Sequence, residues 1–235
     1  MCRVTVFAAV LIAALAGGGR ADDAGLAAAV EKAWKGGEAE KLKQVKAWSM
    51  TQNVKRLAST FKGEYTVTEH AQFPDRVRRE IVTDDKGTKK TELIVVSGGD
   101  WRKRDEAVTN MPRAEAERLR PDVGGATFLR ALDLRDPACG LELLPDGTVA
   151  GRATHAVRLV RKDKLVEILH IDKDSGLIVM VDRGQSVVLF SDFRKIDGIP
   201  VAHARTVMED GKAVEEFKLT FKFAQKLDDK LFEKP

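Results

Sequence analysis

The sequence predicts an α+β protein whose main element is one large curved antiparallel sheet that forms an open half-barrel, with a leading helix and a short middle helical insertion as its lid. Three observations favour this fold. Segments in which apolar and polar residues alternate run from residue 61 to residue 223, the connections between them are too short for parallel crossovers, and helical patterns are few. A twisted sheet of many strands curls, and its apolar concave face needs a cover. A fully packed sandwich would show the same alternation and is the alternative.

Residues 1–21 have the pattern of a secretory signal peptide. A basic stretch, residues 1–3, precedes an uncharged apolar run, residues 4–16, and a small residue, Ala21, ends the segment. The apolar run is shorter than the ~20 residues that cross a bilayer. We therefore expect cleavage near Asp22 and export to the periplasm, with residues 22–235 forming a single domain. A retained membrane anchor is the alternative.

Charge and cysteine usage exclude several classes of protein. The chain has 40 Lys and Arg against 36 Asp and Glu, and cleavage would remove Arg3 and Arg20, leaving 38 against 36 and a net charge of +2. Such a balance argues against nucleic-acid binding, which needs a concentrated basic face. Cys139 would be the only cysteine after cleavage, so no intramolecular disulfide is expected. Cys2 precedes the apolar run, whereas a lipoprotein signal carries its cysteine after that run.

Helical patterns occur at the start and in the middle of the chain. Residues 23–37 predict a helix that Asp23 caps, that places Leu26, Val30 and Trp34 at helical spacing and that ends at Gly36. Residues 110–119 and 125–134 predict two further short helices. These segments are the predicted lid of the sheet.

The rest of the chain predicts about eleven strands. The clearest is "FKLTFKF", in which the apolar residues Phe217, Leu219, Phe221 and Phe223 share one face and the polar residues between them share the other. Similar runs lie at residues 46–54, 63–70, 76–83, 90–96, 154–162, 164–172, 176–182, 186–193 and 201–208. Between the last two, Asp197-Gly198 suits the positive φ angles of a type I′ turn, and Pro200 is tolerated at the first residue of a strand. Residues 190–207 therefore predict a β-hairpin.

Several stretches together resemble a known family. They are the helix end Gly36-Gly37 with the following "EKLKQVKAW", then "QFPDRVRREI", then "VVSGGDWRKR", and a long run from "GTVAGRATHAVRLV" through "HIDKDSGLIVMV" and "FSDFRKIDGIPVAHARTV" to "LDDKLFEKP". In their order and spacing the chain resembles the LolA-like periplasmic lipoprotein carriers, the outer-membrane lipoprotein-sorting proteins. It departs from them at Ala202-His203, where relatives usually carry Pro-Tyr or Pro-Thr and a Lys. Contacts made there are expected to differ.

The resemblance implies a function. Acyl chains of lipoproteins or other lipids would lie in an apolar hollow between sheet and lid, and a monomeric carrier would ferry them from an inner-membrane transporter to an outer-membrane acceptor. Each buried CH₂ contributes ~0.8 kcal/mol, so a long chain gains on the order of 10 kcal/mol by leaving water. The hairpin of residues 190–207 would form part of the cavity wall, and residues 232–235 would fold back to cover an edge of the sheet. No enzyme activity and no cofactor are expected. The cavity residues expected are Val67, Val95, Trp101, Val157, Leu159, Leu189, Phe217, Leu219 and Phe221. A LolA-like sensor that binds a peptide or lipid signal and acts on a membrane partner is the alternative function.

Other side chains admit a chemical and a structural interpretation. The four histidines, His70, His155, His170 and His203, lack metal-ligand spacing, so ordinary strand histidines are favoured and no metal is expected. Cys139 has no obvious base nearby and predicts an idle thiol rather than a nucleophile. The three tryptophans, Trp34, Trp48 and Trp101, are expected to pack in the core rather than to form a stacking platform for a ligand. The Asp residues at 84, 85, 172 and 174 fit tight turns better than a calcium-binding loop. Three arginines could hold a lid, face an acidic partner or simply lie on a solvent-exposed strand edge: Arg76, Arg78 and Arg79.

Overall fold

The structure is a computed structural model that describes residues 23–57, 63–85, 88–96, 99–104, 106–113, 115–116, 127–161 and 165–234. The predicted signal peptide, residues 1–21, lies outside these residues, so the cleavage site and the domain boundary at residue 22 stay predictions. Within the described part of the chain, every helix is too short or too polar to span a bilayer.

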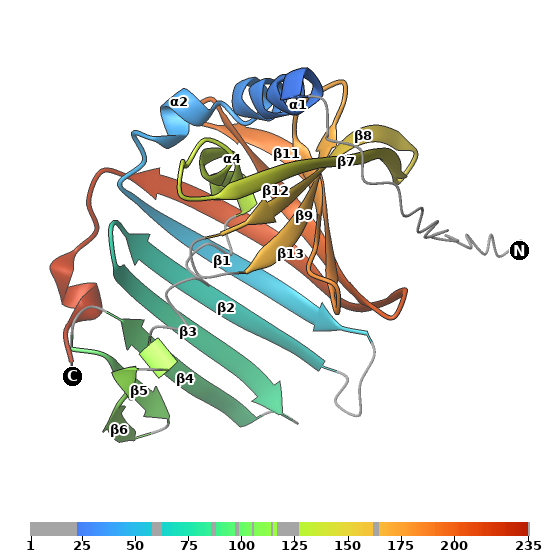
Figure 1. Cartoon of the computed structure of the whole chain (residues 1–235). Coiled ribbons are helices and arrows are strands. Elements are labelled where there is room, and N and C mark those ends of the chain that lie inside the picture. The colour runs from blue at the N-terminus through green and yellow to red at the C-terminus, as the bar shows by residue number, and fades with distance from the viewer. Residues whose placement is uncertain are drawn as a thin grey trace, which may run out of the picture.

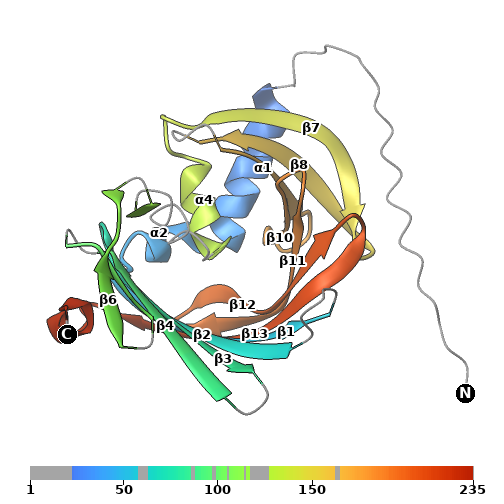
Figure 2. The ribbon, with the colours of Figure 1, turned by 90° about the horizontal axis from the view of Figure 1, so that it is seen from below.

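The described strands form one antiparallel sheet that is not closed. Its order is β6-β5-β4-β3-β2-β1-β13-β12-β11-β10-β9-β8-β7, so β1 and β13 pair in the middle and β6 and β7 are the edges. The sheet curls into a trough, as Figure 2 shows, and this confirms the predicted half-barrel. The strands are β1 (Ala47–Arg56), β2 (Gly63–Gln72), β3 (Arg76–Asp85), β4 (Thr88–Val96), β5 (Trp101–Arg104), β6 (Ala107–Asn110), β7 (Gly140–Val149), β8 (Arg152–Val160), β9 (Val166–Asp172), β10 (Ile178–Asp182), β11 (Val187–Ile196), β12 (Ile199–Glu209) and β13 (Lys212–Ala224).

Helices line the concave side of the sheet. Figure 1 and Figure 2 place α1 (Asp23–Gly36), α2 (Ala39–Leu42) and α4 (Arg130–Asp133) inside the curve, and a 3₁₀ turn, η2 (Thr127–Leu129), leads directly into α4. The predicted leading helix and the helix within residues 125–134 are thus confirmed. The helix predicted at residues 110–119 lies partly outside the described residues.

The described sheet has more strands than predicted because three segments lack clean alternation. β5 and β6 have only four residues each, and β5 carries three basic residues. β7 contains Pro145 and Gly147, and its register with β8 shifts between Leu144 and Gly147. A bulge of this kind breaks the period of two on which a strand is recognised.

The predicted hairpin is present. Ile196 pairs with Ile199 across a two-residue turn, and Asp197 and Gly198 have φ angles of 52° and 78°. Positive φ at both central residues defines a type I′ turn, which matches the twist of the paired strands. The hairpin belongs to the curved sheet as β11 and β12.

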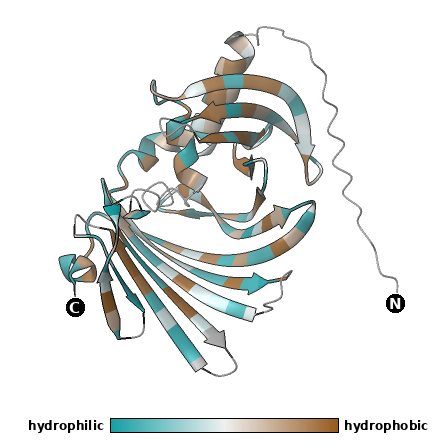
Figure 3. Cartoon of the chain, turned by 60° about the horizontal axis from the view of Figure 1, so that its bottom comes forward, coloured by the Kyte–Doolittle hydropathy of each residue, from teal (hydrophilic) through white to brown (hydrophobic). Residues whose placement is uncertain are grey.

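The apolar core covers the concave face in two halves, and Figure 3 shows apolar and polar residues alternating along the strands of the sheet. On β1 to β4 and β13, buried side chains such as Trp48 and Phe217 pack with Leu129 of the middle insertion. On β8 to β11, a second cluster packs beneath Ala29 and Ala33 of α1, which are almost fully buried. Small residues let the helix approach the sheet closely. The three apolar residues predicted at helical spacing on this helix contact two different clusters. Leu26 and Val30 are partly buried against the second cluster, whereas Trp34 packs with α2 and the start of β12.

The C-terminal segment packs on the outer face of the sheet. Phe232, in the 3₁₀ turn η3 (Asp229–Phe232), is buried with Val95 and Trp101 on the face opposite the hollow. The Arg76 guanidinium lies 4.1 Å from the centre of the Phe232 ring, and Arg78 Nη1 donates a hydrogen bond of 3.0 Å to the Leu231 carbonyl. Two of the three arginines singled out in the sequence therefore hold the end of the chain.

Candidate functional site

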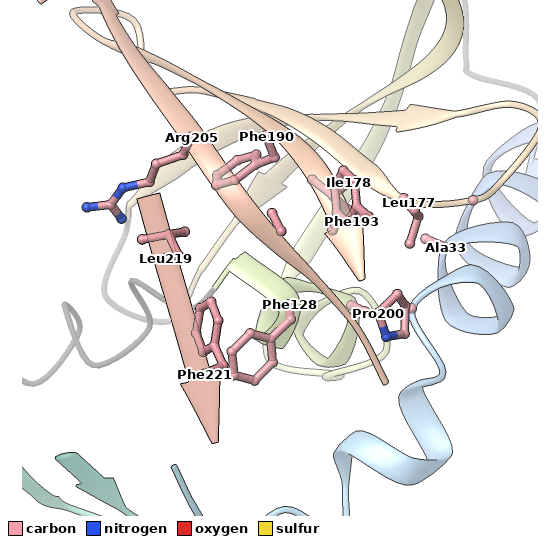
Figure 4. Close-up of a pocket in the computed structure, with 14 residues that line it drawn as sticks. Ala33, Phe128, Leu177, Ile178, Phe190, Phe193, Pro200, Arg205, Leu219 and Phe221 are labelled. Atoms are coloured by element: carbon pink, nitrogen blue, oxygen red, sulfur yellow. The ribbon is translucent and has the colours of Figure 1, made fainter. Parts of the chain in front are cut away.

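An apolar cavity lies on the concave side between the sheet and the helices. Its walls come from α1, the η2–α4 insertion, the β9–β10 turn and strands β10 to β13 (Figure 4). Thirteen of its fourteen lining residues are apolar or glycine, and the remaining one is Arg205. The lining residues are Ala33, Gly37, Phe128, Ala131, Gly176, Leu177, Ile178, Phe190, Phe193, Pro200, Ala202, Arg205, Leu219 and Phe221.

The cavity forms where β12 parts from β13. These strands pair from Glu209 and Lys212 as far as Ala204 and Lys218, while β12 continues pairing with β11 as far as Ile199. On β11, Asp192 has a φ of 52°, a left-handed conformation that interrupts the alternation of the strand.

As a result, Phe190 and Phe193 both reach the cavity although they are three residues apart. On the partner strand, Ala202 and Arg205 do the same. The kink thus supplies apolar groups to a space that a regular strand pair would have closed.

Phe128 of η2 is the central contact between the lid and the sheet. Its ring meets the rings of Trp48, Phe221 and Phe223 edge to face, with centroids 6.0, 5.7 and 5.6 Å apart. Edge-to-face aromatic pairs contribute about 0.5–1.5 kcal/mol each beyond the area that they bury. Phe128 and the buried Leu129 beside it therefore anchor the insertion over β1 and β13.

The cavity is small in this conformation. It measures about 40 Å³, room for roughly three water molecules, which is far less than a long acyl chain. Two wider depressions, of about 570 and 860 Å³, lie between α2 and the β11–β12 turn and on the outer face of β1, β2, β12 and β13. Both are lined in large part by polar and charged residues, so the apolar cavity is the better candidate for an apolar ligand.

A row of polar side chains crosses the concave face beside the cavity. Arg79 on β3 binds Glu69 on β2 through two hydrogen bonds of 2.8 and 3.0 Å to one carboxylate oxygen, and Glu69 is 1% exposed. Further along the sheet, Arg205 Nη2 donates a 2.7 Å hydrogen bond to the side-chain oxygen of Gln52 on β1. Arg79 is thus neutralised by a carboxylate, whereas Arg205 is bound by a neutral amide.

The environment of Arg205 is unusual for a cation. Its guanidinium stacks 3.8 Å above the Phe217 ring, and its Nε atom is buried without a hydrogen-bond acceptor among the described residues. Burial lowers the pKa of Arg205 to about 10, an effect that the negative charge of Glu69 partly offsets. The side chain therefore remains charged at neutral pH in a mostly apolar setting.

The nine residues predicted to line a cavity divide into three groups. Leu219 and Phe221 line the cavity. Four others face the concave side but are packed in the core beside it: Val67, Val157, Leu159 and Phe217. The structure does not bring the remaining three to the hollow, because Val95 and Trp101 lie beneath the C-terminal segment and Leu189 points to the opposite face of β11 from Val188 and Phe190.

Several cavity residues were missed in the sequence. Phe190 follows Leu189 directly, and a strand places consecutive side chains on opposite faces, so an error of one position exchanges the inside for the outside. Phe128 and Arg205 gave no signal of their own, since a phenylalanine in a short helix and an arginine in an alternating strand are both ordinary. The two-phenylalanine pattern "FSDF" was the one available hint.

Comparison with solved structures identifies the fold. No family model matches the sequence, and no curated protein matches it. Similar structures include a LolA superfamily protein from Nitrosomonas europaea (TM-score 0.58, 13% identity, covering 87% of this chain and 97% of that one) and a DUF1329 family protein from Desulfovibrio piger (0.56, 15%, 88% and 97%). A third is a putative outer membrane lipoprotein-sorting protein domain from Vibrio parahaemolyticus (0.52, 14%, 86% and 97%).

These similarities cover most of the chain and nearly all of each neighbour. The chain has a LolA-like fold, as the sequence resemblance implied. At this level of identity the likeness concerns the fold, and function has to be argued from the cavity.

Proposed function

We propose that the protein is an exported carrier that binds the acyl chains of lipoproteins or other lipids in its apolar cavity and ferries them across the periplasm towards the outer membrane. The observation that carries the proposal is the cavity itself: apolar side chains from the sheet and from the lid face one another where β12 leaves β13. The names of the LolA superfamily and lipoprotein-sorting neighbours agree with this function.

The mechanism requires the cavity to open. A space of about 40 Å³ is the closed form, and a ligand must separate the lid from the wall at Phe128, Leu219 and Phe221. The buried pair of Arg130 on α4 with Glu167 on β9 keeps the insertion attached to the sheet while these contacts open. Every CH₂ that enters contributes about 0.8 kcal/mol, so a few methylenes offset the loss of the Phe128 contacts.

The binding and the carrier role need separate experiments. Native mass spectrometry of protein purified from the periplasm without detergent should show a bound lipid or lipoprotein, and a fluorescent fatty acid should bind saturably after lipid removal. The absence of both would contradict lipid binding.

Transport is tested by adding the purified protein to spheroplasts that retain a labelled lipoprotein. We expect release of the lipoprotein into the medium as a soluble complex. If the protein binds lipid but releases none of the lipoproteins tested, the carrier role is contradicted and a lipid-binding sensor is favoured. The same periplasmic preparation tests export, since its intact mass should correspond to a chain that begins near Asp22.

A further inference from the structure

The charge on Arg205 is not explained by the packing of the sheet. It is the one charged residue among the fourteen described residues that line the cavity. In the described part of the chain no carboxylate lies within ion-pair distance of its guanidinium, which is bound by the neutral Gln52 and stacked on Phe217. A cation that is withdrawn from water without an anion is costly, and it is usually compensated by a partner or a ligand.

The pair of Arg79 and Glu69 shows how an arginine on this face is neutralised by a carboxylate. Arg79 sits opposite Glu69 on adjacent strands and binds its carboxylate twice. Arg205 also lies on the concave face, but the residue opposite it on β13 is Phe217, and its side chain reaches past β13 to the neutral Gln52 of β1. Among the described residues Arg205 thus has no carboxylate bound to it, and Glu69 and Glu215 favour its charged form only from beyond ion-pair distance.

Arg205 lies at one end of the cavity. Figure 4 shows its side chain at one end of the group, beyond Leu219 and Phe190, with the guanidinium pointing away from the ring of apolar side chains. Ala33 and Leu177 lie at the other end, against α1. An apolar tail lying between Phe128, Phe190 and Leu219 would therefore bring its head to Arg205.

We infer that Arg205 is the head-group site of the cavity and that the ligand is a lipid with an anionic head, a carboxylate or a phosphate, held tail-inward. This inference rests on the proposed lipid binding and adds the class of lipid. A guanidinium presents a planar fork of donors that matches both anions. The buried Nε, which lacks an acceptor, and the Nη groups beside it supply those donors.

The test compares lipids that differ only in the head. Dodecanoate, dodecyl phosphate and the neutral methyl dodecanoate are titrated against protein that has been freed of lipid and loaded with the neutral fluorophore N-phenyl-1-naphthylamine. We expect at least one anion to bind about tenfold more tightly than the ester, as a charge-assisted hydrogen bond implies. Whichever anion binds more tightly identifies the head as carboxylate or phosphate. Equal binding of all three would overturn the head-group site and leave lipid binding intact, whereas binding of none would overturn both.

Variants locate the effect. Arg205→Gln should weaken binding of the anion more than binding of the ester, so that the preference falls below about threefold. Arg205→Lys, which keeps the charge without the planar fork, should retain an intermediate preference. Arg158→Gln removes an exposed arginine that is paired with Glu142 away from the cavity, and it is the control for net charge.

A preference that survives in Arg205→Gln, or that Arg205→Lys loses to the same extent, would overturn the assignment. Thermal unfolding of Arg205→Gln gives a second criterion. Removing a half-buried cation that has no carboxylate bound to it should leave the melting temperature unchanged or raised, whereas a merely structural arginine would lower it.

Discussion

Gly36, at the end of α1, lies directly against Gly176 in the turn between β9 and β10. A Cβ atom on Gly36 would be 2.4 Å from the Ser175 carbonyl oxygen, and one on Gly176 would be 2.3 Å from the Lys32 carbonyl oxygen. Contact of two backbones fixes the height of the helix above the sheet, and Gly37 and Gly176 also border the cavity. The first prediction concerns this contact.

Gly36→Ala should lower the free energy of unfolding by about 1–3 kcal/mol, because the neighbouring atoms are backbone and cannot move aside. Gly63→Ala is the matched control, since nothing lies within 4 Å of a Cβ at that position, and it should change stability by less than about 1 kcal/mol. Urea denaturation of both variants checks the prediction. Equal stability of the two would show that the helix can lift from the turn without cost.

The second prediction concerns a buried ion cluster that ties α4 to the sheet. Glu167 on β9 is fully buried and lies 2.7 Å from Arg130 Nε of α4 and 2.9 Å from Arg183 Nε, and Arg130 is itself 3% exposed. Glu167→Gln should destabilise the protein by about 3–5 kcal/mol because it leaves a buried arginine with too little negative charge around it.

Glu142→Gln breaks the exposed pair with Arg158 and should cost less than about 1 kcal/mol. Chemical denaturation monitored by tryptophan fluorescence measures both variants. A loss for Glu167→Gln as small as that for Glu142→Gln would mean that water or Asp133 compensates Arg130.

The third prediction is a loss of stability in mild acid. Burial lowers the pKa of His70 and of His170 below the ordinary value of 6.5. As the pH falls through 6.5, the unfolded chain takes up protons that the folded chain resists, so the free energy of unfolding decreases until the lowered pKa values are reached. The lowered pKa of Asp172 affects stability only at a lower pH, below the ordinary aspartate value of 3.8.

The double variant His70→Gln, His170→Gln should have a flatter dependence of stability on pH across this window. Glutamine can still bond to the partners of the two rings, Ser49 and Thr154. Urea denaturation at several pH values between about 7.5 and 5 compares the slopes. A variant slope equal to that of the wild type would assign the acid sensitivity to other groups.

The fourth prediction separates the cavity from the outer face of the same strand. Ala202 lines the cavity, whereas Ala204 pairs with Lys218 and borders the outer depression. Ala202→Leu should weaken binding of a fluorescent fatty acid about tenfold or more by filling the space, at a cost in stability of about 1–3 kcal/mol. Ala204→Leu adds the same volume outside and should bind normally. Similar affinities for the two variants would place the ligand elsewhere.

The sequence by itself determined the class of fold and much of its local structure. Alternation in "FKLTFKF" placed Phe217, Leu219 and Phe221 on one face, and Asp197-Gly198 specified a type I′ hairpin. Both are properties of the chain over a few residues, set by the period of a strand and by the φ angles that each residue tolerates. The order of such segments also carried the likeness to LolA-like proteins.

Only the tertiary structure decided which apolar faces meet a cavity. Val95 and Trp101 are as apolar as Leu219, yet the C-terminal Phe232 covers them on the outer face of the sheet. A shift of one residue in the expected strand would exchange the faces of Leu189 and Phe190. The left-handed backbone at Asp192 then places Phe193 in the cavity together with Phe190. The charge of Arg205 acquires meaning only beside Gln52, which is 153 residues away in the chain. Burial depends on what packs against a face, and contacts between distant segments are not written in the local pattern of either one.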